Sequence, residues 1–393
     1  MIAQNPLSAS AQTRRRFLAT AAGTLGASVG IPGVGFADPK ADEKKQVEDA
    51  VDKGLEWLKK AQAADGHWEG NNGAYQVAMT GLAGMALMME GSNLKEGKYS
   101  EQIAKAVDWC IKKAQQPNGL LAFNQNPGDF GSYMHGHGFA TMFLASAYGE
   151  SEDKDQQDKL EQAIKKAAEF SAKAQSSKKH TFEDGRTAMV GGWGYTSAAD
   201  SGIDEGSITV TQLQALRAAR NAGIGVPKET IDKALAYLEA CTTPNGGIIY
   251  SYISSNGKAT NGQERPPLTV AAVAGSFSAG QYKGELAKKW VKFCKEKVPF
   301  AKGRVAHDEY QSYYFAQFVY VLGDDKYGVM FPKEDKADWL TWSKFKAAMY
   351  PYLVEQQDKT GMWSSGFVGP VFSTAVNLAI LQLDKAVLPI YQR

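Results

Sequence analysis

Hydrophobic and polar positions alternate along this chain in two kinds of helical segment. In the first kind, Val47, Val51, Leu55 and Leu58 recur at helical spacing, and charged residues fill most positions between them. The next segment, 75–89, contains no charged residue. A helix with one apolar face lies at a surface, whereas a helix that is apolar all round is buried on every side. The pattern predicts an outer helix followed by an inner one.

This pair recurs along the chain. The charged segments are predicted at 47–62, 101–115, 159–175, 228–241, 285–297 and 339–356. The nearly uncharged segments follow them at 75–89, 133–148, 207–222, 268–279, 310–322 and 371–383. A glycine near the end of each charged segment supplies a conformation that ends helices: Gly66, Gly119, Gly192, Gly246, Gly303 and Gly361. Because a helical hairpin cannot bury its apolar face alone, neighbouring hairpins must stack.

We therefore predict an all-α fold, an (α/α)6 toroid of six helical hairpins with an uncharged inner ring and a charged outer ring. We expect the ring to close, because an open stack would leave the first and last hairpins without a neighbour on one side. Contact between the first and last helix pairs tests this prediction. A polar lead-in at 38–46 precedes a single toroid domain at 47–393. The long connectors 116–132, 176–206 and 246–265 are where binding loops are expected.

The first 37 residues have a different character. Residues 13–18 read Thr-Arg-Arg-Arg-Phe-Leu, and a small-residue stretch follows that ends in Ala37. This order predicts a twin-arginine signal peptide at 1–37, read by the twin-arginine export machinery, and an exported, periplasmic bacterial protein. A disordered basic tail fits less well, because the arginines, Phe17-Leu18, the small-residue stretch and Ala37 all agree with a signal peptide. A retained membrane anchor also fits less well, because glycines interrupt the apolar run. The route carries folded proteins and does not require a cofactor.

Composition narrows the range of partners. The 393 residues are 44% hydrophobic and 22% charged, as in ordinary globular proteins. Removal of residues 1–37 removes three arginines and no acidic residue, so the formal charge changes from +2 to −1 and gives no reason to expect nucleic acid. Cys110, Cys241 and Cys294 are odd in number and lack metal-type spacing, so we expect no metal site and at least one free, buried thiol.

One stretch, 53–68, carries a recognisable motif. It contains Lys53-Gly54, Trp57-Leu58, Gln62, Gly66 and Trp68. This order resembles the repeat of squalene-hopene and oxidosqualene cyclases and of protein prenyltransferase β-subunits. That repeat has a basic residue, a small residue, an aromatic–aliphatic pair, Gln and then Gly-x-Trp. The resemblance covers about residues 47–385 and implies the same toroid.

Weaker copies of the motif keep its second half. They are Gln357 with Gly361 and Trp363, and Gln175 with Gly192 and Trp193. The resemblance implies a structural role, in which Gln joins neighbouring turns and Trp fills gaps between repeats. Threonines also recur near the starts of the inner helices, as Ser/Thr-Ala segments do in the cyclases: Thr80, Thr211, Thr269 and Thr374.

The chemistry of that family is not carried over with the motif. Cyclases of this kind protonate an isoprenoid with an Asp-x-Asp-Asp segment, and residues 207–211 read Ser-Ile-Thr-Val-Thr where it would stand. Related prenyltransferases bind zinc through Asp, Cys and His near inner helices, whereas all three cysteines here fall on predicted outer helices or their ends.

Acidic residues and histidines at the starts of the inner helices are the candidate acids and bases: Asp204, Glu205, His137, His307, Asp308 and Glu309. The alternative is that the acids cap helices and the histidines are packed. His135 and His137 would point about 200° apart on a helix, which opposes joint metal binding. His137 is expected to face the interior of the ring, in phase with Thr80 and Thr211.

Aromatic residues on the inner helices and connectors are the candidate ligand contacts: Tyr75, Tyr133, Phe139, Trp193, Tyr195, Tyr310, Tyr313 and Tyr314. Aromatic faces stabilise cations and equally suit passive binding of an apolar chain, although most could be core.

Three functions are open. The first is an exported terpene-cyclase-like or prenyltransferase-like protein that binds a hydrophobic isoprenoid-type ligand. One form of this hypothesis adds that the protein transforms the ligand, and a membrane surface is a further candidate partner. The second is an (α/α)6 polysaccharide lyase or glycosidase, and the third is a scaffold that binds a protein. A dry aromatic chamber favours the first, an open acidic groove the second and a filled lumen the third.

Overall fold

The computed structural model describes residues 39–123, 131–149, 153–200, 203–253, 255–281, 284–298, 308–364 and 366–392. The predicted signal peptide and His307 lie outside the described residues, as does the side chain of Asp308. The chain divides into two compact units, Met1–Asp42 and Glu43–Arg393, and the second is described below.

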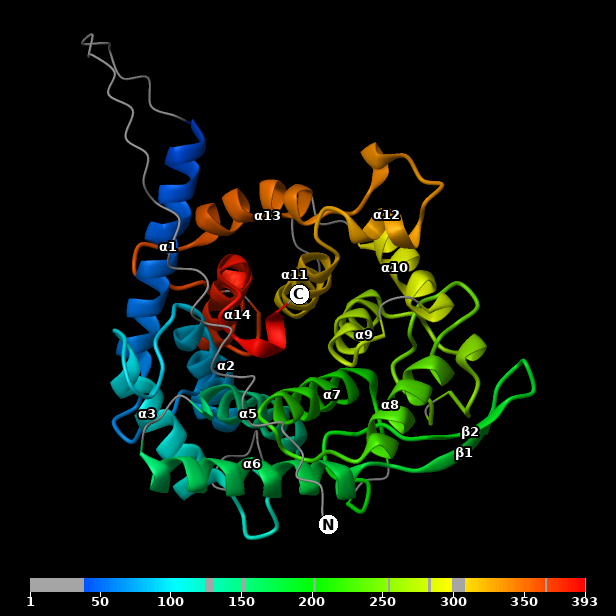
Figure 1. The fold of residues 1–393 in the computed structure, drawn as a ribbon, viewed down its shortest axis with the longest axis horizontal. Helices are drawn as coiled ribbons and strands as arrows, with labels where there is room; N and C mark the ends of the chain where they lie inside the picture. Colours follow the sequence, from blue (N-terminus) through cyan, green and yellow to red (C-terminus); the bar gives the residue numbers. More distant parts are fainter. Residues whose placement is uncertain are drawn as a thin grey trace, which may run out of the picture. The chain divides into compact units, whose positions relative to one another are not determined.

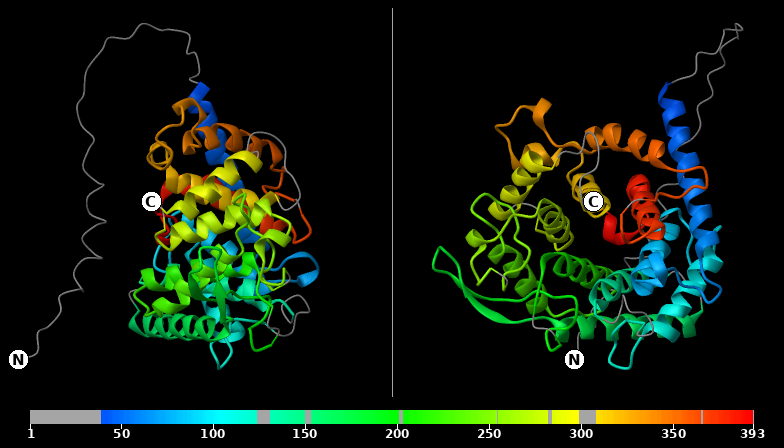
Figure 2. Two further views of the ribbon diagram at one scale, coloured as in Figure 1. Left: turned by 90° about the vertical axis from the view of Figure 1, so that its right-hand side faces the viewer. Right: turned by 180° about the vertical axis from the view of Figure 1, so that it is seen from behind.

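Within the described residues, two concentric sets of six helices alternate along the chain (Figures 1 and 2). The outer set is α1 (Pro39–Ala61), α3 (Ser100–Trp109), α6 (Lys154–Ala174), α8 (Lys228–Ala240), α10 (Glu285–Lys297) and α13 (Trp342–Gln356). The inner set is α2 (Gln76–Met89), α5 (Tyr133–Ala147), α7 (Gly206–Asn221), α9 (Pro266–Ser278), α11 (Asp308–Leu322) and α14 (Pro370–Gln382). The predicted all-α toroid of six hairpins is confirmed.

Short segments join these helices. A π-helical turn at Cys110–Ala114 extends α3, and helix α12 spans Lys326–Met330. Single 3-10 turns occupy Asn71–Gly73, Ala259–Asn261, Lys336–Asp338, Leu383–Lys385 and Pro389–Tyr391.

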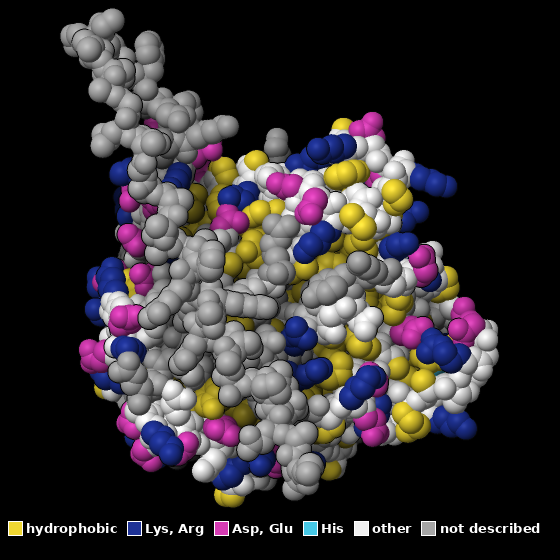
Figure 3. Space-filling model, in the orientation of Figure 1, with side chains coloured by type: hydrophobic (Ala, Val, Ile, Leu, Met, Phe, Trp, Pro, Cys, Tyr) yellow, Lys and Arg dark blue, Asp and Glu magenta, His cyan; other side chains and the backbone are white. Residues whose placement is uncertain are grey.

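Burial follows the charge pattern. Every residue of α2 from Val77 to Met89 is buried, whereas α10 buries only one face, which includes Ala287, Trp290 and Val291. On the face seen in Figure 3, charged side chains lie mainly at the periphery and hydrophobic ones show nearer the middle. The uncharged helices are therefore the core of the ring. Among the described residues, no helix combines the length and apolarity needed to cross a membrane.

Helix α1 begins at Pro39, before the predicted start at Val47. Residues 43–46 are exposed and carry no apolar stripe. Two ion pairs at helical spacing, Lys44–Glu48 at 3.7 Å and Lys45–Asp49 at 3.3 Å, extend the helix into solvent. The apolar pattern missed this turn because it is held by local contacts alone.

A β-hairpin interrupts the helices in the connector 176–206. Strands β1 (Lys178–Thr181) and β2 (Thr187–Val190) are antiparallel, with Lys178 opposite Val190. The sequence analysis predicted only a long connector, because strands of four residues are too short to give a clear periodic pattern.

The ring closes between its last and first helix pairs. The side-chain amide of Gln382 donates to the carbonyl of Ala86 at 3.1 Å, and the Asn71 N–H donates to Val368 O at 2.8 Å. Gly361 has a φ of 99°, and a Cβ there would lie 2.4 Å from the carbonyl oxygen of Lys53. Only glycine allows the last turn to approach the first helix this closely.

The repeated glutamines link one outer helix to the next. Each donates from its side-chain amide to a backbone carbonyl of the following outer helix at 2.8–2.9 Å: Gln62 to Gln102, Gln115 to Ala163, Gln175 to Thr230 and Gln357 to Ala50. The repeated tryptophans do the same within a pair. Trp68, Trp193 and Trp363 each donate Nε1–H to a carbonyl of the preceding outer helix at 2.7 Å.

A second bond recurs just after five of the six predicted glycine turns, and the sixth, at Gly303, lies outside the described residues. The backbone N–H there donates to a side chain on the next inner helix, at 2.9–3.1 Å: Trp68 to Thr80, Leu121 to His137, Trp193 to Thr209, Ile248 to Thr269 and Trp363 to Thr374. Thr209, not Thr211, is therefore the equivalent of Thr80. In the second pair, His137 takes the place of threonine.

All three cysteines, Cys110, Cys241 and Cys294, are free and buried. Burial raises the pKa of each thiol. They are inert core residues.

Candidate functional site at the N-terminal end of the inner ring

Glu205 lies at the start of α7 and caps it. Its carboxylate accepts from the backbone N–H of Ser207 at 2.9 Å and of Ile208 at 2.7 Å, and it also accepts from the Ser207 hydroxyl. The residue is 1% exposed. Two backbone donors at a helix N-terminus compensate part of the cost of burying the carboxylate.

His135, in the first turn of α5, reaches the same serine. Its Nε2 lies 3.2 Å from Ser207 Oγ. Because the Ser207 hydroxyl hydrogen is directed to Glu205, Nε2 must be the donor to Ser207 Oγ, and the neutral ring then presents Nδ1 as an acceptor. This Nδ1 is buried and has no hydrogen-bond partner among the described residues.

Tyr310, in the first turn of α11, contributes a second unpartnered atom. Its hydroxyl is buried without a hydrogen-bond partner among the described residues. Its ring packs on that of Tyr314 at a centroid distance of 4.7 Å, and it interacts electrostatically with Ser207 and Glu205. We call Glu205, Ser207, His135 and Tyr310 the Glu205 cluster.

Two tyrosines connect this cluster to solvent. The hydroxyls of Tyr195 and Tyr250 lie 2.7 Å apart, and the two residues are 41% and 39% exposed. The rings of Tyr195 and His135 meet edge to face and those of Phe139 and His135 stack, each pair with ring centroids 6.2 Å apart. The cluster therefore has aromatic walls and an accessible side.

Burial dominates the electrostatics of the cluster. It raises the pKa of Glu205, against the effect of the Ser207 donors, and it raises the pKa of Tyr310. It lowers the pKa of His135 to about 4. At neutral pH the histidine is neutral, which agrees with its bond to Ser207.

Several predicted site residues lie elsewhere. Asp204 is buried and accepts from Ser176 Oγ at 2.8 Å, and burial raises its pKa. Glu309 is buried near α14, where its carboxylate accepts from Ser373 Oγ at 3.3 Å. No contact among the described residues joins Glu309 to Glu205.

The sequence analysis expected His137 to face the interior of the ring, but in the structure it does not. Its Nδ1 accepts from the Leu121 N–H at 3.1 Å, and its Nε2 lies 3.2 Å from Ala167 O and 3.0 Å from Ser171 Oγ, both on α6. Both ring nitrogens are engaged, so none is left for chemistry. Helical geometry turns His137 outward and His135 toward α7.

The aromatic candidates do not all lie at one site. Tyr310 belongs to the Glu205 cluster, and Tyr195, Tyr314 and Phe139 surround it. Tyr133 is held outside it, because its hydroxyl donates to Asp200 and accepts from Ser197 N at 2.8 Å. Trp193 fills a gap between repeats. Tyr75 lies at the start of α2 with a left-handed φ of 57°.

The interior behind the cluster is bridged by side chains. Tyr314 OH lies 3.3 Å from Thr211 Oγ1, and the Gln214 amide donates to Gln317 at 2.7 Å. The Tyr313 hydroxyl bonds that of Tyr391, which is 4% exposed. The turn Pro389–Tyr391 packs against α7 and leaves a cavity of only about 10 Å³ beside Tyr391.

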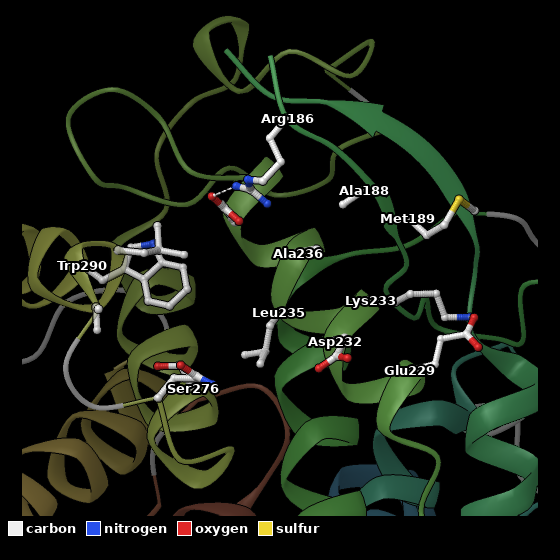
Figure 4. A pocket seen from close by; sticks show the side chains of 15 residues that line it. Arg186, Ala188, Met189, Glu229, Asp232, Lys233, Leu235, Ala236, Ser276 and Trp290 are labelled. Atoms are coloured by element: carbon white, nitrogen blue, oxygen red, sulfur yellow. Dashed lines mark hydrogen bonds and ion pairs between the residues drawn. The ribbon is translucent and has the colours of Figure 1, made fainter. Parts of the chain in front are cut away.

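A groove of about 510 Å³ lies outside the ring, between α8, α10 and the hairpin (Figure 4). Leu235 and Trp290 are among its apolar lining residues. Its rim charges are paired with one another, Arg186 with Glu239 and Lys233 with Glu229. Asp232, the remaining charged lining residue, pairs with Lys228, which is not a lining residue. The lining residues therefore offer no unpaired charge to select a ligand. Among the described residues no group of His, Cys, Asp and Glu is arranged to hold a metal ion.

The fold and these contacts define a closed α/α toroid. It is similar to the type II terpene cyclase MstE from Scytonema, with 14% identity over 88% of this chain and 99% of the cyclase, at a TM-score of 0.51. It is also similar to an α-1,6-mannanase from Salegentibacter sp. HEL1_6, with 9% identity, coverage of 87% and 99%, and a TM-score of 0.56.

A family 76 glycoside hydrolase from a bovine Bacteroides thetaiotaomicron strain is similar at a TM-score of 0.57, with 8% identity over 87% of this chain and 78% of the hydrolase. No protein-family model and no curated protein sequence matches the chain. These likenesses establish the fold. The chain is a divergent toroid, and the same fold serves both a terpene cyclase and a mannanase.

Proposed function

We propose that this protein binds a hydrophobic, isoprenoid-type ligand at the N-terminal end of its inner ring and does not cyclise it. The observation that carries the proposal is the Glu205 cluster, in which buried, unpartnered polar atoms stand among aromatic rings that reach solvent at Tyr195 and Tyr250. Unpaired buried polar groups cost free energy, and a ligand that pairs with them recovers it.

Two features favour binding over cyclisation. A carboxylic acid that protonates an alkene must direct its proton at the substrate, whereas both Glu205 oxygens accept from donors of α7. A long chain that folds during cyclisation also needs a chamber, and the interior behind the cluster is bridged by Tyr314 and Gln214.

The test is recovery of the native ligand. The protein is purified from its exported compartment, and native mass spectrometry is combined with lipid extraction. We expect an isoprenoid-type mass that Tyr195→Ala with Tyr250→Ala reduces. Recovery of no lipid, together with binding on a glycan array, would contradict the proposal.

Glycan binding is the second candidate function. The exposed rings of Tyr195 and Tyr250 could serve as a platform for a sugar. The same glycan array distinguishes the two candidates, because the isoprenoid proposal expects no glycan signal.

Exposed apolar side chains support a surface partner. Ile203 is 54% exposed and Phe367 is 72% exposed, on loops that precede α7 and α14. We include a membrane surface in the proposal, as the source of an apolar ligand. Vesicle flotation tests it, and Phe367→Ser is expected to reduce the bound fraction.

Export through the twin-arginine route remains part of the proposal. Its support is the sequence of residues 13–18. Replacement of Arg14, Arg15 and Arg16 by lysine in a reporter fusion is expected to leave the protein in the cytoplasm. Unchanged export would contradict it.

A further inference from the structure

We infer that the ligand carries a hydroxyl group, which donates a hydrogen bond to Nδ1 of His135 and accepts one from Tyr310. The inference rests on the proposed function and specifies the chemistry of the ligand's polar end. It starts from two of the ten buried side-chain atoms that have no hydrogen-bond partner among the described residues. These two, Tyr310 OH and His135 Nδ1, both belong to residues around Ser207.

The proton positions follow from the bonds already made. The Ser207 hydroxyl donates to Glu205, so His135 Nε2–H donates to Ser207 Oγ and Nδ1 is left as an acceptor. A phenolic hydroxyl is a donor as well as an acceptor, so Tyr310 can donate. The cluster therefore offers one acceptor and one donor in an aromatic environment.

Other polar ends fit less well. An anionic diphosphate or carboxylate would approach the buried carboxyl group of Glu205, where a second negative charge is unfavourable. A quaternary ammonium would suit the rings but can neither donate to Nδ1 nor accept from Tyr310. A hydroxyl both donates and accepts, and it is neutral.

The experiment compares two probes that differ only in this group. Binding of the C15 isoprenoid alcohol farnesol and of its methyl ether is measured by equilibrium dialysis with the full-length protein. We expect the alcohol to bind about tenfold more tightly, because the ether cannot donate to Nδ1. His135→Phe is expected to remove this preference while retaining the affinity for the ether.

Tyr310→Phe is expected to weaken both probes, because both accept from Tyr310. The matched control is Tyr148→Phe. Tyr148 lies just beyond the end of α5 opposite to His135, and its hydroxyl donates to Glu161, so the substitution should leave both affinities unchanged. Retained ether binding in His135→Phe shows that the variant is folded.

The outcomes separate the two proposals. Equal binding of alcohol and ether by the wild type overturns the hydroxyl inference and leaves the proposed function standing. Binding of neither probe counts against the proposed function and therefore against both. A preference for the alcohol that survives in His135→Phe also overturns the inference, because the selective contact would then lie elsewhere.

Discussion

The side-chain amide of Gln357 donates to the backbone carbonyl of Ala50 at 2.8 Å, across the junction where the last helix pair meets the first. The same amide nitrogen donates to Gly361 O at 2.8 Å. Gln62 makes the equivalent pair of bonds, to Gln102 O and Gly66 O, between the first and second outer helices. One residue type thus serves both as the link between neighbours and as the closure of the ring.

We predict that Gln357→Ala destabilises the protein about as much as Gln62→Ala, by about 1–3 kcal/mol. Each substitution leaves two carbonyls without their donor. Urea unfolding measures both free energies. Gln357→Ala with wild-type stability beside a destabilised Gln62→Ala would show that the ring is open in solution.

Thr209 and Thr211 are predicted to differ sharply in importance. Thr209→Val leaves the buried N–H of Trp193 without an acceptor and should cost about 1–3 kcal/mol. The Thr211 hydroxyl donates to Ser207 O and meets Tyr314, but it pairs no backbone N–H, so Thr211→Val should cost less. Thermal unfolding of the two variants compares them. Equal losses would contradict the assignment of Thr209 to the repeated position.

His135 is predicted to make stability depend on pH in acid. Its pKa is lowered from 6.5 to about 4 by burial, so its contribution is present above pH 6.5 and is lost as pH falls toward 4. The wild type should therefore lose stability relative to His135→Phe over this range. Nitrogen NMR should show the Nε2–H tautomer at neutral pH. An Nδ1–H tautomer would reverse the proton assignment in the cluster.

Glu205 is predicted to act in the opposite direction. Burial raises its pKa above 4.5, so the stability it contributes is fully present below the unfolded pKa and declines as pH rises through the folded value. The difference in unfolding free energy between the wild type and Glu205→Gln should therefore shift against the wild type as pH rises from 4.5. A constant difference would contradict this.

Tyr391→Ala is predicted to open the interior. It removes a buried ring beside Tyr313 and Ile390 and should cost about 3–5 kcal/mol. Calorimetry in the presence of benzene tests for the new cavity, since only the variant should be stabilised by it. Tyr391→Phe, which loses the hydroxyl alone, is the control and should not respond.

The sequence predicted most of the architecture because the signal is periodic. The uncharged segment 75–89 corresponds to α2, and 285–297 coincides with α10. The candidate site was predicted less well. Glu205 and Tyr310 were identified as candidates, but His137 was chosen instead of His135. The spacing of two residues on a helix does not show which of them faces α7.

The sequence alone therefore determined the alternation of solvent-exposed and buried helices, the number of these helices and the turns between them. These features depend on local composition and spacing. Only the tertiary structure decided which side chains meet. Three hydrogen bonds illustrate this, since they join residues far apart in the sequence. They link His135 to Ser207, Tyr314 to Thr211 and Gln357 to Ala50, which are 72, 103 and 307 positions apart. Contacts of that range are set by the packing of all six helix pairs and leave no trace in any local pattern.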